Sequence, residues 1–85
     1  MLFMVIERFK NRDLLAQRFE RNGRMLPEGV NYQASWVVSD GSRCFQIMEA
    51  PDRETLMPWV RCWDDIVDFE VIPVVTSQQY WASRA

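Results

Sequence analysis

Glu7 is the side chain whose position in the sequence points most directly to chemistry. It lies within residues 2–9, a nearly continuous apolar run of strand length. A carboxylate that points into a closed cavity has its pKa raised by desolvation, and it can then act as a general acid or base. The alternative is that Glu7 lies past the edge of the folded core and pairs with an arginine such as Arg43. Glu7 is therefore the candidate catalytic residue.

Other reactive groups are few. The chain of 85 residues contains no histidine, which removes the usual general base and the commonest metal ligand. Its three glycines form no phosphate-binding motif. Cys44 is either a thiol made reactive by a cationic neighbour or a buried, inert cysteine. An acidic cluster is either a hard-cation site or a solvated turn, and its spacing does not fit a calcium loop. This cluster consists of Asp64, Asp65, Asp68 and Glu70. We therefore predict no metal site and no cofactor.

The residues most suited to a ligand cavity lie on a predicted hairpin. Residues 32–39 and 42–49 are strand-like runs joined by Asp40-Gly41, a pair suited to a two-residue type I′ turn. Such a turn pairs residues whose numbers sum to 81, and strands alternate faces, so the hairpin has two sides. One side holds Tyr32, Ala34, Trp36, Val38, Arg43, Phe45, Ile47 and Glu49. The other side is small and mostly neutral, and it holds Gln33, Ser35, Val37, Cys44, Gln46 and Met48.

The small, neutral side is the preferred lining for a ligand. Neutral polar side chains packed against helices would each need a hydrogen-bond partner, whereas they suit an interior that holds water or a ligand. The predicted ligand-binding residues are Gln33, Ser35, Cys44, Gln46 and Met48. The opposite assignment stays open, and it places Tyr32, Trp36, Arg43 and Glu49 in the cavity instead.

Two amphipathic helices accompany these strands. Leu15, Phe19, Asn22 and Leu26 recur at helical spacing, after possible capping residues at 11–13 and before Pro27-Glu28-Gly29. Arg18, Arg21 and Arg24 recur every three residues, which indicates a solvated helix face.

The second helix carries two tryptophans. Trp59 and Trp63 lie one turn apart, and they form either an aromatic wall or simple helix-to-sheet core. Because Pro58 fits only near a helix's first turn, the regular part should begin close to Thr55.

The order of elements predicts an α+β fold. Residues 67–75 form a last strand, which Pro73 places at a sheet edge. The βαββαβ order predicts a ferredoxin-like sandwich, with a four-stranded antiparallel sheet of order 4-1-3-2 and both helices on one face. Residues 1–76 would form this domain. Residues 77–85 would form a tail whose Tyr80 and Trp81 either cover a neighbour's sheet edge or cavity mouth or are disordered.

Composition indicates the partners. The net charge of −2, with acids and bases interleaved, gives no sign of nucleic-acid binding. No apolar run reaches the ~20 residues of a membrane span, and no signal peptide is recognisable, so we expect a cytoplasmic protein with reduced thiols. The large apolar content, including four tryptophans, predicts that the helix-free face of the sheet meets a second copy of the chain.

Four segments carry a family resemblance: residues 1–10, 23–29, 43–49 and 68–75. Over roughly residues 1–76 the chain resembles an uncharacterised bacterial family, domain of unknown function 3303, with the tail outside the pattern. The resemblance implies a dimeric α/β barrel and carries over no catalytic residue.

The leading hypothesis is a homodimer that binds a small molecule between the paired sheets, through Gln33, Ser35, Gln46 and Glu7. A second hypothesis is a cofactor-independent monooxygenase or isomerase, which rests on analogy between folds. A third is a structural or partner-binding module that makes contact through its aromatic tail or helix faces.

Overall fold

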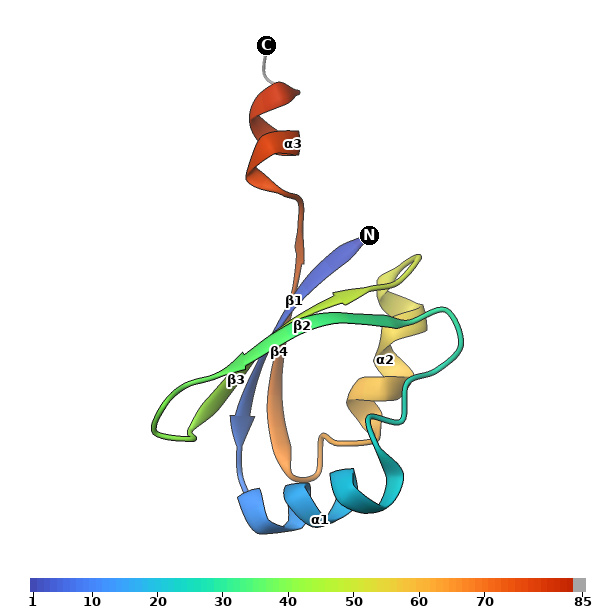
Figure 1. The fold of residues 1–85 in the computed structure, drawn as a ribbon. Helices are drawn as coiled ribbons and strands as arrows, with labels where there is room; N and C mark the ends of the chain where they lie inside the picture. Colours follow the sequence, from blue (N-terminus) through green and yellow to red (C-terminus); the bar gives the residue numbers. More distant parts are fainter. Residues whose placement is uncertain (84–85) are drawn as a thin grey trace.

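A computed structural model describes residues 1–83, which fold into a sheet with helices packed against it (Figure 1). The elements are β1 (Leu2–Phe9), α1 (Arg12–Asn22), β2 (Asn31–Val37), β3 (Arg43–Glu49), α2 (Arg53–Arg61), β4 (Val67–Val74) and α3 (Ser77–Ala82). The predicted βαββαβ order is confirmed, and a short C-terminal helix follows it.

The sheet has the predicted topology. Its four strands are antiparallel in the order β2-β3-β1-β4, which is the predicted order read from the opposite edge. β4 is an edge strand, as Pro73 predicted. Because one side of β4 has no neighbouring strand, a residue without an N–H is tolerated there. The central strands β1 and β3 therefore position the residues at the middle of the sheet.

One face of β1 is fully buried against the helices. Phe3 and Val5 are at most 1% exposed, and they pack with Leu56 and Trp59 of α2. The alternate β1 residues, including Met4, point to the other face and are only half-buried. This alternation shows which face of the sheet the helix layer covers.

The hairpin turn differs from the predicted type. Val38 N–H donates to the Arg43 carbonyl over 2.9 Å, and Gly41 N–H donates to the Val38 carbonyl over 2.7 Å, so four residues form the loop. Gly41 has a φ of 76°, but Asp40 does not have the positive φ that a type I′ turn requires. The predicted register is still correct next to the loop, where the numbers of paired residues sum to 81, as in the pair Trp36 and Phe45. The four-residue loop is centred on Asp40 and Gly41, as the predicted two-residue turn was.

A bulge in β2 changes the predicted faces at its start. Tyr32 pairs with Met48 whereas Ala34 pairs with Ile47, so Gln33 is an extra residue with no partner in the register. Tyr32 therefore turns to the helix-covered face, opposite to its predicted side. Gln33 is exposed, and its role in ligand binding stays a prediction.

Both main helices begin at side-chain caps. The Asn11 side chain accepts from Leu14 N over 3.0 Å, and the Asp52 side chain accepts from Thr55 N over 2.7 Å. The prediction that the second helix begins near Thr55 is therefore wrong by two residues, and Pro58 lies inside α2.

α1 ends earlier than predicted. Gly23, with a φ of 65°, caps α1 and donates to the Phe19 carbonyl, so Leu26 and Arg24 lie beyond the helix. None of the helices in the described range is long and apolar enough to span a membrane.

The C-terminal segment extends away from the sheet (Figure 1). Thr76 and Gln79 form a reciprocal capping box that begins α3. Tyr80 and Trp81 lie on this helix, with 50% and 61% of their surface exposed, so they are not part of a disordered tail. Residues 84 and 85 lie outside the described range, and an independent domain of residues 1–76 stays a prediction.

Candidate functional site

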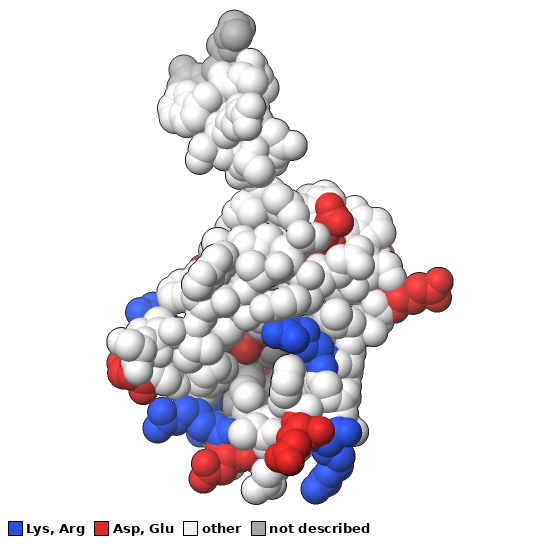
Figure 2. All heavy atoms as spheres, in the orientation of Figure 1, with Lys and Arg blue, Asp and Glu red and all other residues white. Residues whose placement is uncertain are grey.

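A cavity of about 190 Å³ lies between the sheet and the two main helices. Figure 2 shows its opening as a hollow, with basic atoms at the rim and acidic atoms inside. The lining residues are Glu7, Phe9, Leu15, Phe19, Arg24, Ser35, Val37, Cys44, Gln46, Trp59 and Trp63. At ~15 Å³ for each water-sized sphere, this volume holds roughly a dozen such spheres.

The cavity corrects the predicted location of the site. The small, neutral side of the hairpin faces the helices within one chain, so it cannot line a space between two sheets. The small, neutral residues of the hairpin were expected to pack poorly against helices, and the structure agrees with this in one respect. The helix layer leaves an unfilled space over them, and α1 has no fully buried residue.

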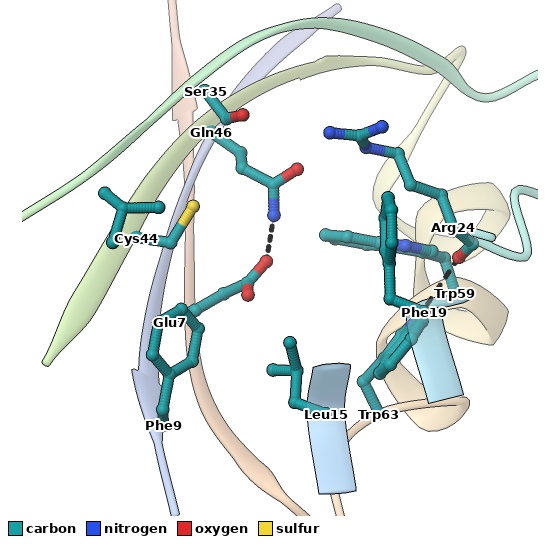
Figure 3. A pocket seen from close by; sticks show the side chains of 11 residues that line it. Glu7, Phe9, Leu15, Phe19, Arg24, Ser35, Cys44, Gln46, Trp59 and Trp63 are labelled. Carbon is teal, nitrogen blue, oxygen red and sulfur yellow. Dashed lines mark hydrogen bonds between the residues drawn. The ribbon is translucent and has the colours of Figure 1, made fainter. Parts of the chain in front are cut away.

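Glu7 and Gln46 form the polar base of this cavity. They are the two buried polar side chains in the described part of the chain, at 7% and 6% exposure. Val5 pairs with Gln46 and Glu7 pairs with Cys44, so Glu7 and Gln46 are diagonal neighbours on one face of the sheet. The Gln46 Nε2 amide donates to Glu7 Oε2 (Figure 3).

Burial raises the pKa of Glu7 to about 7, and the bond from Gln46 and the charge of Arg24 oppose part of this rise. The carboxyl group is therefore close to half-protonated at neutral pH. The alternative in which Glu7 lies past the core and pairs with Arg43 is not what the structure shows, since Glu7 is buried in the cavity.

Cys44 lies beside Glu7 and has the opposite character from a reactive thiol. Burial, together with the nearby Glu7 carboxylate, raises its pKa to about 11. The thiol stays protonated at neutral pH, so Cys44 serves as a small apolar wall.

The walls opposite the sheet are aromatic. Trp59 of α2 and Trp63, which lies in the turn just after α2 ends, are both buried and line the cavity. Both interpretations of this pair therefore apply, because the two rings are core and also form an aromatic wall. Trp63 Nε1–H donates to the Arg24 carbonyl over 3.1 Å. Trp59 Nε1–H is buried and has no hydrogen-bond acceptor among the described residues.

Arg24 stands at the mouth of the cavity. Its guanidinium lies 3.6 Å from the centre of the Tyr32 ring and 5.3 Å from that of Phe19. No acidic side chain of the described residues forms an ion pair with it. The mouth therefore carries a positive charge that aromatic rings hold in place.

The predicted ligand-binding residues separate into three groups. Ser35, Cys44 and Gln46 line the cavity, and Ser35 shares a 2.6 Å hydrogen bond with the Tyr32 hydroxyl. Met48 is fully buried in the core and Gln33 is exposed, so neither lines this cavity, and their roles in ligand binding stay predictions.

Arg24 was missed from sequence because its three-residue spacing from Arg21 indicated a solvated helix face. Gly23 is the signal that could have found it, since a helix that ends there frees Arg24 to turn toward the sheet.

Two carboxylates of the predicted acidic cluster bond to cations of the same chain. Asp65 accepts both of its bonds from Arg18 at 2.8 Å, and Asp68 lies 3.3 Å from Lys10. Within residues 1–83, no three acidic or cysteine side chains converge as metal ligands.

The fold and the cavity define a small ferredoxin-like α+β protein with an intramolecular pocket. The family model described as "Domain of unknown function (DUF3303)" matches residues 1–84, and the chain belongs to this family. The match includes the C-terminal segment that was expected to fall outside the pattern. No curated protein and no solved structure is significantly similar to the chain.

Proposed function

We propose that this protein binds a small, largely apolar molecule inside the cavity between the sheet and the helices. The observation that supports this proposal is the buried Glu7–Gln46 pair at the base of a cavity whose walls are otherwise mostly aromatic and aliphatic. Binding sites for small molecules combine this kind of apolar lining with a few convergent polar groups. The volume of about 190 Å³ is below the usual range for drug-sized ligands, so the ligand is compact.

Two groups in the cavity select the polar part of the ligand. Glu7 at the base accepts or donates a hydrogen bond according to its protonation. Arg24 offers a cationic group at the mouth. A planar, unsaturated molecule with an oxygen at one end can bond to Glu7, and its ring lies against the aromatic walls.

Closing the cavity should remove binding. In Leu15→Trp the larger side chain occupies the space over the sheet, because Leu15 lines the cavity from α1. Wild-type protein titrated with 4-methylphenol should show saturable shifts of the Gln46 side-chain amide and the Trp59 indole N–H in two-dimensional NMR spectra. The variant should lose affinity at least about tenfold, which is ~1.4 kcal/mol.

Leu14→Trp is the matched control, because Leu14 precedes Leu15 on the same helix but is 38% exposed and does not line the cavity. Its affinity for 4-methylphenol should stay within about twofold of wild type, in contrast to the loss of about tenfold expected for Leu15→Trp. Equal binding by the wild type and Leu15→Trp would contradict a site in this cavity.

We also propose that the helix-free face pairs with the same face of a second copy. Half-buried and exposed apolar side chains form two rows there, which the register defines. One row holds Trp36, Phe45 and Ile6, with Glu70 at its β4 end, and the next row crosses all four strands with Ala34, Ile47, Met4 and Ile72. A contiguous apolar surface of this kind is typical of an interface.

The charges around this surface support a second copy as the occupant. Arg43 and Glu49 mark opposite ends of β3 on the helix-free face, and Arg8 lies between Arg43 of β3 and Asp68 of β4. A twofold axis that lies between the two sheets and runs across β3 would bring Arg43 of one copy beside Glu49 of the other. An isologous pairing is therefore complementary in charge as well as apolar.

A further inference from the structure

One oxygen of the Glu7 carboxyl group is open to the cavity. Oε2 accepts from the Gln46 amide, and no described residue bonds to Oε1. Within residues 1–83, the buried side-chain atom that lacks both a partner and accessible surface is the Trp59 indole nitrogen, so Glu7 Oε1 is accessible. Figure 3 shows the carboxyl group pointing from β1 into the space between the sheet and the helices. A molecule in the cavity can therefore bond to Glu7 through Oε1.

A ligand in this cavity changes the surroundings of that oxygen. The cavity opens at the surface (Figure 2), so water reaches the carboxyl group when no ligand is bound. Glu7 is nevertheless only 7% exposed, and burial is the main cause of its pKa of about 7. A molecule that fills the cavity displaces the remaining water, and the ionised form of Glu7 then becomes less favourable. Binding of an uncharged molecule therefore favours the protonated acid.

The protonated acid offers a hydrogen-bond donor to the ligand. Because Oε2 already accepts from Gln46 Nε2, the acid proton belongs on Oε1, where it points into the cavity. The matching group on a ligand is an acceptor such as a carbonyl oxygen. Phe9, Leu15 and Phe19 line the cavity together with the two tryptophans, so the body of the ligand meets mostly aromatic side chains.

The charges around the cavity favour an uncharged ligand. The charge of Arg24 already acts on Glu7 and opposes part of the rise in its pKa. A cationic ligand would meet this like charge at the mouth. An anionic ligand would be attracted to Arg24 at the mouth and away from Glu7 at the base. A neutral carbonyl compound avoids both effects and bonds to Oε1.

We propose that the cavity binds an uncharged aromatic carbonyl compound whose oxygen accepts a hydrogen bond from the protonated Glu7 carboxyl group, and that binding takes up a proton. This inference rests on the proposed function, since it names the class of ligand for the same cavity.

Glu7 sets the pH dependence of this binding. The other titratable or charged groups that line the cavity are Cys44 on β3 and Arg24 after α1. β2, α1 and α2 contribute hydroxyl, apolar and aromatic side chains, and the β4 residue paired with Glu7 is Phe69. The pKa of Cys44 is about 11, so its thiol stays protonated across neutral pH. Because the ligand needs the protonated acid, affinity should be constant well below the Glu7 pKa of about 7 and should fall above it.

Acetophenone titrated at pH 5.5 and at pH 8.5 tests the proposal, with the Gln46 side-chain amide as the NMR reporter. Its Kd should be at least about tenfold higher at pH 8.5, because only the protonated fraction of Glu7 binds it. Calorimetric titration at pH 7, in two buffers of different ionisation enthalpy, should show uptake of about half a proton. The resonance of a ¹³C-labelled carbonyl should stay at or downfield of its position in water, since the hydrogen bond from Glu7 replaces those from water.

Glu7→Gln separates the effect of the proton from the rest of the site. The glutamine can accept from Gln46 through its oxygen and donate to the ligand through its amide, as the protonated acid does. At pH 8.5 this variant should bind acetophenone within about twofold of the wild-type affinity at pH 5.5, and without proton uptake. Glu20→Gln is the control, because Glu20 is an exposed acid on α1 outside the cavity. It should keep the wild-type pH dependence.

Two sets of results distinguish this inference from the binding function. Acetophenone binding that does not weaken at pH 8.5, or an upfield shift of the bound carbonyl, overturns the inference and leaves the binding function standing. Binding of 4-methylphenol without binding of acetophenone does the same. Failure of both compounds to bind at either pH overturns both proposals. Wild-type pH dependence in Glu7→Gln also overturns the inference, and if that variant does not fold, the proton uptake of the wild type decides.

Discussion

Replacing Glu7 with glutamine should make the protein more stable at pH 8 by about 1–3 kcal/mol, and this gain should vanish near pH 4. The carboxyl group has a pKa of about 7 in the folded chain against a reference of 4.5. Between these two values the unfolded chain has released its proton while the folded chain retains it. Stability therefore falls as the pH rises from about 4.5 to about 7, and the full loss persists above that range.

The magnitude follows from the difference between the two pKa values. A difference of about 2.5 units corresponds to about 3 kcal/mol, and reorganisation around the ionised group lowers that figure. Glu7→Gln removes the ionisation but retains an oxygen that can accept from Gln46 Nε2. Urea unfolding at several pH values, at one fixed protein concentration, measures the gain.

Glu20→Gln provides the comparison, because it removes an acid that is exposed on α1. It should show no gain that grows with pH. A Glu7→Gln variant that is less stable than wild type at pH 8 would mean that Arg24 stabilises the ionised Glu7 by more than burial destabilises it.

Trp36→Glu should convert the proposed dimer into a folded monomer at micromolar concentration. Trp36 is 60% exposed on the helix-free face, next to Phe45, so the change costs a single chain little packing. In the dimer it would place two carboxylates related by symmetry inside an apolar interface, where each unpaired charge is strongly unfavourable. Size-exclusion chromatography with light scattering measures the mass.

Leu14→Glu tests whether any added charge has this effect. Leu14 is 38% exposed on α1, in the helix layer, so its substitution should leave the mass unchanged. A monomeric wild type, or an unchanged dimer in Trp36→Glu, would contradict pairing through the helix-free face.

The topology and the strand register were predictable because they depend on local chemistry. Alternating side chains and a short polar loop fix how β2 meets β3 around Trp36 and Phe45, even though the turn itself has four residues rather than two. The bulge at Gln33 was not predictable, since no glycine marks it. That single extra residue moved Tyr32 to the face where it supports Arg24.

The side of the sheet that carries the site could not be settled from residue type. The prediction treated Gln46 and Ser35 as isolated polar groups that would each lack a partner beneath helices. In the structure Gln46 bonds to Glu7 from the neighbouring strand, and Ser35 bonds to Tyr32, so each finds its partner within the sheet. The predicted strand order placed β1 beside β3, but it did not give the register between these two strands. The register makes Glu7 and Gln46 diagonal neighbours, and it is known only from the structure.

α1 has no fully buried residue, and this bears on how readily the helix opens. A helix that contributes few buried contacts opens at low free-energy cost, so its amides should exchange with solvent sooner than those of α2, where Leu56, Trp59 and Val60 are buried. A bound molecule would supply the missing contacts to Leu15 and Phe19 and slow that exchange. Opening of α1 would then admit the ligand to the cavity. Slower amide exchange in α1 would show that the ligand is bound.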